Sequence, residues 1–322
     1  MKPKIYITRK IPQVIYDQFT EIADVRMWEE AEIPVPREIL LQEVRAIDGL
    51  LCLLTETIDE EVIRQATKLK IISNMAVGFN NIDVSFAKKQ GVIVTNTPGV
   101  LTETTADLTF ALMMATARRI VEASDYLRNG EWKTWSPMQL TGRDIYGATL
   151  GIIGMGRIGQ ALARRAKGFK MNILYYNRAR KLEVEKELGI EYCDFETLLR
   201  RSDFVSLLLP YSSEVHHLIG ENEFKLMKET AILINTARGG IVDETALYHA
   251  LKNGELWAAG LDVFESEPID LESPLLSLPN VVTLPHIGSA SEATRLKMAE
   301  IAANNIIQVL KGGQPLTPVK IK

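Results

Sequence analysis

The sequence predicts an α/β protein with two domains, each a doubly wound parallel sheet that helices cover on both faces. Three observations predict this class. Short apolar segments alternate with helical patterns in the first hundred residues, and the alternation returns with longer apolar segments from residue 149. A turn cluster at residues 96–99, Asn-Thr-Pro-Gly, separates the two stretches. A glycine-rich turn at residues 154–159 stands between an apolar strand and a helical run.

Length and composition favour a soluble globular protein. The 322 residues are 46% hydrophobic and 24% charged, which suits two domains of ordinary size. A formal net charge of −4 argues against a nucleic-acid binder, which is normally basic. The sequence has no signal-peptide pattern and no run of about 20 apolar residues, so we expect a cytoplasmic protein without a membrane span. Two cysteines, Cys52 and Cys193, are too few for a disulfide framework or a cysteine-ligated metal site, and no metal is predicted.

In the first domain, strands alternate with helices. Strands are predicted at residues 4–8, 24–28, 49–53, 71–74 and 92–95, with helices at 12–22, 37–46, 60–66 and 84–90. The turn at residues 76–81 directly follows the fourth strand. Because open parallel sheets bind ligands at the carboxyl ends of their strands, the backbone N–H groups of Val77 and Gly78 can hold a carboxylate there. An ordinary connection between strand and helix is the alternative.

The segment that follows the turn cluster indicates a subunit contact. Residues 105–117 form a helical pattern that is apolar nearly all the way round, which predicts burial in a core or at an interface between subunits. The arm at residues 132–137, Trp-Lys-Thr-Trp-Ser-Pro, has no regular period. Exposed tryptophans such as Trp135 usually pack against another surface, so the arm predicts a dimer partner.

The second domain starts with a turn that is typical of dinucleotide binding. A strand at residues 149–153 leads into Gly154, Gly156 and Gly159, with the spacing GxGxxG, and a helix follows that should end at Gly168. The glycines allow a tight turn, the approach of a pyrophosphate, and close packing of helix on strand. The N–H groups and the partial positive charge at the helix start favour phosphate binding.

The rest of this domain completes the sheet. Further strands are predicted at residues 172–176, 204–209, 231–235, 258–263 and 281–284. Several of them are continuous apolar runs, as strands covered on both faces should be. Pro285 and Gly288 then mark a second crossing between the domains, and a long helix is predicted at residues 289–310.

The choice of cofactor depends on the end of the second strand of this sheet. In sheets that prefer NAD, an Asp or Glu there binds the ribose 2′-hydroxyl, but this sequence has Asn177. Without the acid no charge repels a 2′-phosphate, and Arg178 or Arg180 can bind it through charge-assisted hydrogen bonds. We therefore expect NADP(H) to be preferred, with NAD(H) as the second option.

Only one of the four histidines lies where chemistry is expected. His286 follows the strand at 281–284, at the sheet edge where the ligand should lie. His216, His217 and His249 are expected to serve packing or the surface.

Three more charged residues lie at or beyond the ends of strands in the same domain. Arg238 comes after the strand at 231–235, Asp262 is near the end of the strand at 258–263, and Glu267 lies in the loop after it. Hydride reduction of a 2-keto acid requires a cation that binds the carboxylate and polarises the carbonyl, an acid near neutral pH, and a carboxylate that orients the acid. Arg238, His286 and Glu267 supply these three groups.

Four separated motifs then resemble one family. GIIGMGRIG, NTARGG, GLDVFESEP and LPHIGSAS, in this order and spacing, are similar to those of the D-2-hydroxyacid dehydrogenases, and the resemblance extends over nearly the whole chain. The segments NMAVGFNNIDV and WKTWSP and the basic Asn177–Arg178 loop resemble the glyoxylate/hydroxypyruvate reductase branch most closely.

The resemblance implies a role for each matching residue. Arg238 would bind the substrate, His286 would donate the proton, and Glu267 would be its partner. Val77 and Gly78 would bind the substrate carboxylate through the backbone. The cofactor contacts that it implies are Gly154, Gly156, Arg157, Ile158, Gly159, Asn177, Arg178, Thr236, Ala237, Asp262 and Gly288.

The resemblance also implies the division of the chain. A flavodoxin-like substrate domain would consist of residues 1–98 and 287–322. A Rossmann dinucleotide-binding domain would consist of residues 99–286, with a dimerisation arm at about residues 102–146. The family's members are typically homodimers.

The expected activity is therefore NAD(P)H-dependent reduction of glyoxylate or hydroxypyruvate to the D-2-hydroxy acid. A 2-ketogluconate reductase or a broad 2-keto-acid reductase is the alternative enzyme. A dinucleotide-sensing protein related to corepressors, which binds NADPH but turns over no 2-keto acid, is the alternative from a different class.

Overall fold

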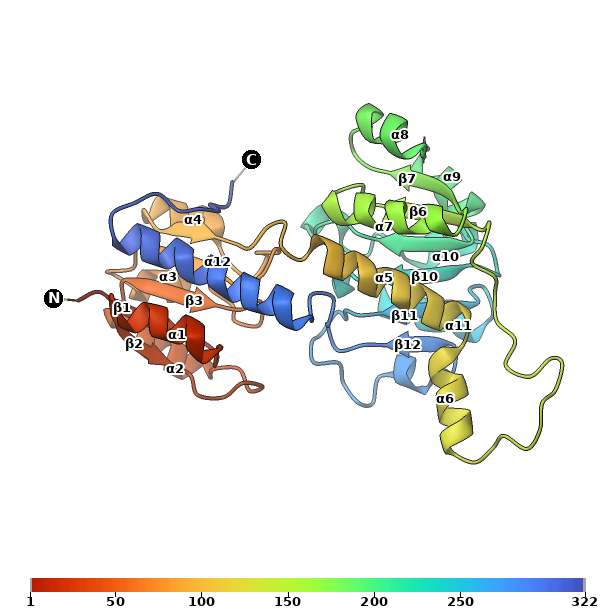
Figure 1. The fold of residues 1–322 in the computed structure, drawn as a ribbon, viewed down its shortest axis with the longest axis horizontal. Coiled ribbons are helices and arrows are strands. Elements are labelled where there is room, and N and C mark those ends of the chain that lie inside the picture. The colour runs from red at the N-terminus through yellow and green to blue at the C-terminus, as the bar shows by residue number, and fades with distance from the viewer. Residues whose placement is uncertain (1, 321–322) are drawn as a thin grey trace. The chain divides into compact units, whose positions relative to one another are not determined.

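The computed structural model describes residues 2–320, which separate into two compact units. One unit comprises the chain up to Leu101 and again from Ala290, and the other comprises Thr102–Ser289 (Figure 1). The chain passes from one unit to the other after residues 101 and 289, in each case three residues beyond the predicted limits of 98 and 286. The first boundary lies later because helix α5 begins at Thr102 and belongs to the second unit. At the second, Asp262 Oδ1 accepts a hydrogen bond of 2.7 Å from the N–H of Ile287, which ties that segment to the second unit.

The first unit contains a five-stranded, fully parallel sheet with the strand order β2-β1-β3-β4-β5. This is the flavodoxin-like order 2-1-3-4-5. Its strands are β1 (Lys4–Ile7), β2 (Asp24–Met27), β3 (Gly49–Cys52), β4 (Ile71–Asn74) and β5 (Ile93–Thr95). The central strands β3 and β4 are buried along their whole length, whereas the edge strand β2 is only half-buried.

Helices cover both faces of this sheet, because successive apolar side chains along its strands point to opposite faces. Ile5 and Ile7 point to a core shared with the first and last helices, and Tyr6 points to a second core on the opposite face. The helices are α1 (Gln13–Thr20), α2 (Arg37–Glu43), α3 (Glu60–Gln65), α4 (Val84–Lys89) and α12 (Glu292–Leu310). Small residues of α12, including Ala299 and Ala302, are fully buried in the first core, which brings the end of the chain into this unit.

The second unit contains a seven-stranded parallel sheet with the strand order β12-β11-β10-β9-β6-β7-β8. Counted from β6, this is the Rossmann order 3-2-1-4-5-6 with a seventh strand added, and the strand order reverses between β6 and β9. The strands are β6 (Thr149–Ile153), β7 (Asn172–Tyr176), β8 (Glu191–Tyr192), β9 (Phe204–Leu207), β10 (Ile232–Asn235), β11 (Ala258–Leu261) and β12 (Val281–Thr283). The expectation of two doubly wound parallel sheets is confirmed.

Two cores flank this sheet. Helices α5 (Thr102–Ala117) and α7 (Arg157–Gly168) cover one face, and α9 (Phe195–Arg201), α10 (Glu221–Leu226) and α11 (Glu244–Lys252) cover the other. Two further helices are α6 (Ile120–Arg128) and α8 (Leu182–Leu188). Helix α5 packs on α7, β10 and β11, which explains why it is apolar nearly all round.

Some local predictions are corrected. Helix α7 includes Gly168, and the left-handed residue that follows the helix is Lys170, with φ 50°. The last helix starts at Glu292 rather than 289, because the Ser291 side chain accepts a hydrogen bond from the N–H of Thr294 and caps it there. Strand β8 was not expected, since two residues are too short to show an apolar pattern. None of the helices within residues 2–320 has the length and apolar composition needed to cross a membrane.

Candidate active site

The glycine-rich turn is built at the point where the strand order of the second sheet reverses. Gly154 has φ 106°, and a Cβ there would lie 2.6 Å from the carbonyl carbon of Leu208, so only glycine fits. A Cβ on Gly159 would lie 2.4 Å from the carbonyl oxygen of Gly154, so this glycine lets α7 pack closely on the turn. A Cβ on Gly156 would meet nothing within 4 Å, which leaves open space in front of the helix start.

The start of α7 is suited to phosphate. Gly156 is the N-cap residue and carries no side chain, so no side-chain oxygen satisfies the first N–H groups of the helix. Arg157 is exposed and has no ion pair within residues 2–320, and Ile158 is half-buried. A bound dinucleotide would place its pyrophosphate against these groups, which supply N–H donors and the positive end of the helix dipole.

Asp262 gives a second indication that a cofactor fits. The residue follows β11 and is 1% exposed; its Oδ1 accepts the N–H of Ile287, but its Oδ2 is buried without a hydrogen-bond partner within the described chain. Burial raises the pKa of this carboxyl, and the N–H of Ile287 opposes the rise. A buried acceptor without a donor is costly, and the amide group of a nicotinamide would satisfy it. Gly288 adjoins this oxygen, because a Cβ on it would lie 3.2 Å from Oδ2.

The basic loop after β7 contains one engaged arginine and one that is more accessible. Arg180 donates to both carboxylate oxygens of Glu185, at 2.8 and 2.7 Å, and this contact helps to lower the pKa of Glu185 to about 2. Arg178 lies 3.6 Å from Glu214, and both side chains are more than 70% exposed. Asn177 donates to the carbonyl of Ala179 at 3.0 Å, directly after the strand end where NAD-binding sheets carry an acid. Of the two arginines considered for a 2′-phosphate, the structure therefore favours Arg178.

His286 and Glu267 lie together at the carboxyl edge of this sheet. His286 follows β12 in the left-handed conformation, with φ 54°, and its Nδ1 is 2.6 Å from Oε2 of Glu267. The imidazole favours the charged carboxylate and lowers the pKa of Glu267, although burial opposes this. The other carboxylate oxygen accepts the N–H of Phe264 at 3.1 Å, so the acid is held on two sides. The ring nitrogen Nε2 makes no hydrogen bond within residues 2–320.

Arg238 follows β10, and its backbone is fixed by neighbouring groups. The side-chain amide of Asn235 donates to the Arg238 carbonyl at 2.9 Å, and Nη1 of the arginine donates to the carbonyl of Ala237 at 2.7 Å. Burial lowers the pKa of Arg238, whereas Glu267 opposes the change, which also places this carboxylate in the electrostatic surroundings of the guanidinium. Arg238, Glu267 and His286, which are separated along the chain, therefore belong to one edge of the second unit.

Thr236 connects this edge to helix α5, and Ala237 is held by the end of β10. The hydroxyl of Thr109 donates to the carbonyl of Thr105 at 2.7 Å, so the hydroxyl of Thr236, also 2.7 Å away, is the donor to Thr109. The N–H of Ala237 donates to the side-chain oxygen of Asn235 at 3.0 Å. Both residues are buried, so packing in the interior of the second unit holds this segment in place.

In the first unit, several backbone N–H groups of the turn after β4 have no hydrogen-bond partner within residues 2–320, those of Val77 and Gly78 among them. The carbonyls of Val77 and Gly78 accept hydrogen bonds of 2.8 Å from the side-chain amides of Asn96 and Asn74, respectively. Neither asparagine was predicted to contact this turn: Asn96 lies 19 residues beyond Val77, and Asn74, only four residues before Gly78, ends a buried strand.

His217 is a second histidine near a carboxylate that the sequence analysis assigned to packing or the surface. Its Nε2 lies 3.0 Å from Oε1 of Glu265, two residues before Glu267. Its ring stacks on that of His216, with 3.9 Å between ring centroids. The third histidine of this group, His249, is exposed on α11.

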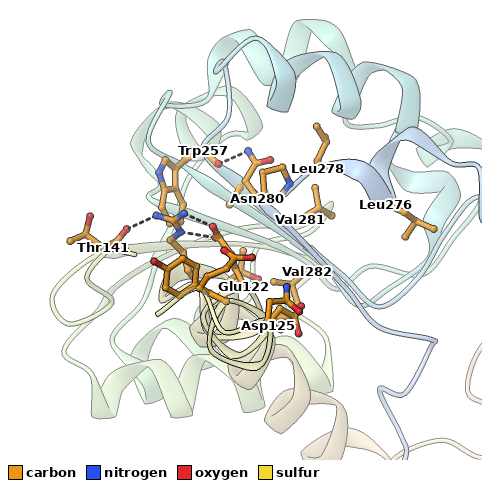
Figure 2. Close-up of a pocket in the computed structure, with 17 residues that line it drawn as sticks. Glu122, Asp125, Thr141, Trp257, Leu276, Leu278, Asn280, Val281 and Val282 are labelled. Carbon is orange, nitrogen blue, oxygen red and sulfur yellow. Dashed lines mark hydrogen bonds and ion pairs between the residues drawn. The ribbon is translucent and has the colours of Figure 1, made fainter. Parts of the chain in front are cut away.

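A cavity of about 790 Å³ lies at the opposite edge of the second sheet and contains none of the predicted catalytic or cofactor residues. Ala258 and Val281, which line it, are the first residues of β11 and β12, whereas His286 follows the other end of β12. Figure 2 shows Glu122 of α6 in the wall of this cavity, with Trp257 above it. Within the described residues, no cluster of histidine, cysteine or acidic side chains could hold a metal ion.

Comparison with known proteins adds the following findings. Residues 110–288 match the family model described as D-isomer specific 2-hydroxyacid dehydrogenase, NAD binding domain. The chain is 54% identical over 316 residues to a glyoxylate reductase of Korarchaeum cryptofilum, covering 98% of this chain and 95% of the relative. It is also 54% identical over 323 residues to a glyoxylate reductase of Pyrococcus horikoshii, with coverage of 99% and 96%.

Solved structures give the same result. A Thermus thermophilus protein matches with a TM-score of 0.92 at 44% identity, covering 98% of this chain and all of that one. An NADPH-dependent glyoxylate/hydroxypyruvate reductase of Sinorhizobium meliloti, solved with NADP and malonate, matches with a TM-score of 0.85 at 33% identity. That match covers 99% and 97% of the two chains.

Proposed function

This chain belongs to the D-isomer specific 2-hydroxyacid dehydrogenase family, and on this premise we propose that it reduces glyoxylate, with hydroxypyruvate as a second substrate. The reaction class is NAD(P)H-dependent reduction of a small 2-keto acid. The substrate assignment is supported by relatives named glyoxylate reductase that match nearly the full chain at 54% identity. The observation that carries the chemistry is the Nδ1 of His286 held 2.6 Å from Glu267 at the carboxyl edge of the dinucleotide-binding sheet.

We propose that three side chains act on the carbonyl of the substrate. The nicotinamide cofactor, when bound, supplies the hydride. The guanidinium of Arg238 offers paired donors to the substrate and polarises the carbonyl oxygen, on which negative charge develops. His286 gives its Nε2 proton to that oxygen, since Nδ1 is taken by Glu267. The Glu267 carboxylate orients the ring by accepting the hydrogen bond from Nδ1.

The substrate carboxylate is assigned to the turn after β4. Two successive backbone N–H groups, those of Val77 and Gly78, are without partners within the described chain and offer charge-assisted hydrogen bonds to an anion.

We propose that NADP(H) is preferred and that Arg178 binds its 2′-phosphate. The double substitution Asn177→Asp with Arg178→Ala should lower the ratio of kcat/KM for NADPH to that for NADH by about 10²-fold. It removes a charge-assisted hydrogen bond and adds a carboxylate that repels the phosphate. Steady-state kinetics with both cofactors measure the ratio. Arg180→Ala is the matched control and should leave the ratio nearly unchanged, because Arg180 is engaged with Glu185. An unchanged ratio in the double variant would reject the phosphate assignment.

We propose a homodimer that buries α6 and the arm after it. Residues 129–148 form no helix or strand, and large apolar side chains there are exposed, with Trp135 at 76% and Met138 at 76%. The cavity beside α6 lies at the same end of the unit and offers a surface for a second copy. Light scattering of the purified protein tests whether its mass is that of two chains.

We also place the enzyme in the cytoplasm, where its free, buried thiols Cys52 and Cys193 remain reduced.

A panel of 2-keto acids tests the proposed function. Glyoxylate, hydroxypyruvate, pyruvate and 2-ketogluconate are assayed with NADPH and NADH by absorbance of the reduced nicotinamide. Glyoxylate with NADPH should give the highest kcat/KM. A higher value for 2-ketogluconate would favour the alternative enzyme. Binding of NADPH without turnover of any 2-keto acid would favour a dinucleotide sensor.

A further inference from the structure

We propose that Asn96 is a positioning residue that aims the N–H of Gly78, in the turn after β4, at the substrate carboxylate, and that Asn74 holds the next carbonyl of the same turn. This inference rests on the proposed function, which assigns the carboxylate to Val77 and Gly78. Neither asparagine needs to touch the substrate, because both act through the backbone carbonyls of the turn.

Three successive carbonyls of this turn are held by hydrogen bonds. The carbonyl of Ala76 accepts the N–H of Thr97 at 2.9 Å, and the carbonyls of Val77 and Gly78 accept the amides of Asn96 and Asn74 at 2.8 Å each. In a planar trans peptide the C=O and the N–H of the next residue point in opposite directions. Fixing the carbonyls of Ala76 and Val77 therefore directs the N–H groups of Val77 and Gly78 away from these partners.

The side chain of Asn96 is held because its own backbone is fixed by the end of the chain. The hydroxyl of Thr317 donates to the Asn96 carbonyl at 2.6 Å, and the carbonyl of Thr317 accepts the N–H of Asn96 at 3.3 Å. Thr317 is held in turn by Asn305 of α12, which is fully buried and bonds to both its hydroxyl and its N–H. The carboxyl-terminal segment thus supports the turn through Asn96.

The side chain of Asn74 is held from the other side. Its amide also donates to the side-chain oxygen of Asn81 at 3.2 Å, and Asn81 donates to the carbonyls of Leu53 and Glu56 at 2.9 and 3.0 Å. Asn74 itself is fully buried at the end of β4. The side-chain amides of Asn74 and Asn96 are therefore held in place before any ligand binds. Less conformational entropy is then lost when a carboxylate binds to the turn.

This arrangement predicts a specific kinetic effect. An anion held by the turn is bound equally in the ground state and the transition state, so loosening the turn should raise KM for the 2-keto acid and leave kcat largely intact. Cofactor affinity should not change, because the cofactor residues belong to the other unit.

The test uses two substitutions at one position in the full-length protein. Asn96→Leu removes the donor while keeping the same branching and number of heavy atoms, and Asn96→Asp keeps the shape but, when ionised, presents only acceptors to the Val77 carbonyl. Both should raise KM for glyoxylate and the inhibition constant of oxamate, an unreactive carboxylate analogue, by about tenfold. The kcat and the KM for NADPH should stay within about threefold of wild type.

Trp28→Phe is the control. It removes another side-chain N–H that donates to a backbone carbonyl in the same unit, that of Ile33 at 2.9 Å, and should leave KM for glyoxylate unchanged. Lowering the pH should bring KM of the Asn96→Asp variant back toward wild type, because the protonated acid can donate to Val77 again. This recovery distinguishes positioning from general loss of structure.

Several results would overturn the inference. If the wild type reduces glyoxylate but both Asn96 variants keep its KM, the inference fails and the proposed function stands. A second contrary result is a lower kcat together with higher KM values for both glyoxylate and NADPH, in the leucine variant and, at every pH, in the aspartate variant. Asn96 would then serve only the fold. If the wild type reduces no 2-keto acid, the proposed function itself fails, and the ligand assigned to this turn fails with it.

Discussion

Replacing His286 by alanine should lower kcat for 2-keto acid reduction by about 10³-fold, while the dissociation constant for NADPH stays within about twofold of wild type. A positioned general acid contributes about 10²–10⁴-fold to a rate. The ring of His286 is held on Nδ1 by Glu267, at 2.6 Å, so Nε2 is the proton donor that the variant loses. The cofactor-binding turn at Gly154 lies on a different strand end and keeps its geometry. Single-turnover kinetics and fluorescence titration of NADPH measure the two quantities.

Two further variants make this result interpretable. His249→Ala removes an exposed imidazole on α11 and should leave kcat unchanged. Glu267→Gln keeps the ring but removes the carboxylate that accepts from Nδ1 and orients it. We expect a kcat between those of wild type and His286→Ala, because the ring remains but no charged acceptor fixes its orientation. An unchanged kcat in His286→Ala would remove this histidine from the mechanism.

Arg238→Ala should lower kcat/KM for glyoxylate by about 10³-fold, with both a lower kcat and a higher KM. A guanidinium that contacts the substrate and polarises its carbonyl loses two charge-assisted hydrogen bonds, which together amount to about 4 kcal/mol. The backbone of Arg238 is held by Asn235, so truncating the side chain should not displace the strand end. Initial rates over a range of glyoxylate and NADPH concentrations separate the two parameters.

Arg238→Lys is the informative companion. Lysine keeps the charge but not the planar pair of donors, so its kcat/KM should lie between those of wild type and the alanine variant. A loss confined to kcat in Arg238→Ala, with KM for glyoxylate unchanged, would show that the guanidinium does not hold the substrate in the ground state. NADPH binding should remain close to wild type in both variants.

Much of the fold could be predicted because its signals are local. The strands at residues 149–153 and 172–176 coincide with β6 and β7, since each contains a run of apolar residues that marks a buried strand. Boundaries set by single side chains were missed: Ser291 caps α12 later than expected, and Lys170 rather than Gly168 takes the left-handed conformation after α7. Helix α6 was not expected, because none of its residues is buried and its pattern points to no core of this chain.

The candidate site was predictable only in part, because some of its contacts join residues that no local pattern connects. The position of His286 directly after an apolar strand marked it as a residue of the sheet edge. The local charge pattern did not distinguish Arg178 from Arg180, although the resemblance implied Arg178. In the structure the two differ because Glu185, five residues beyond Arg180, binds Arg180. Likewise, only the folded chain brings Asn96 to the carbonyl of Val77, nineteen residues earlier.

By itself, the sequence determined two parallel sheets, a glycine turn before a helix, and the order of polar residues after successive strands, because each is encoded within about twenty neighbouring residues. The tertiary structure alone decided which of those polar groups meet. It placed Glu267 on Nδ1 of His286, left Oδ2 of Asp262 without a donor, and held the carbonyls of one turn with distant amides. Such contacts depend on strand order and on the paths of loops, and these are set by packing over the whole unit rather than by local pattern.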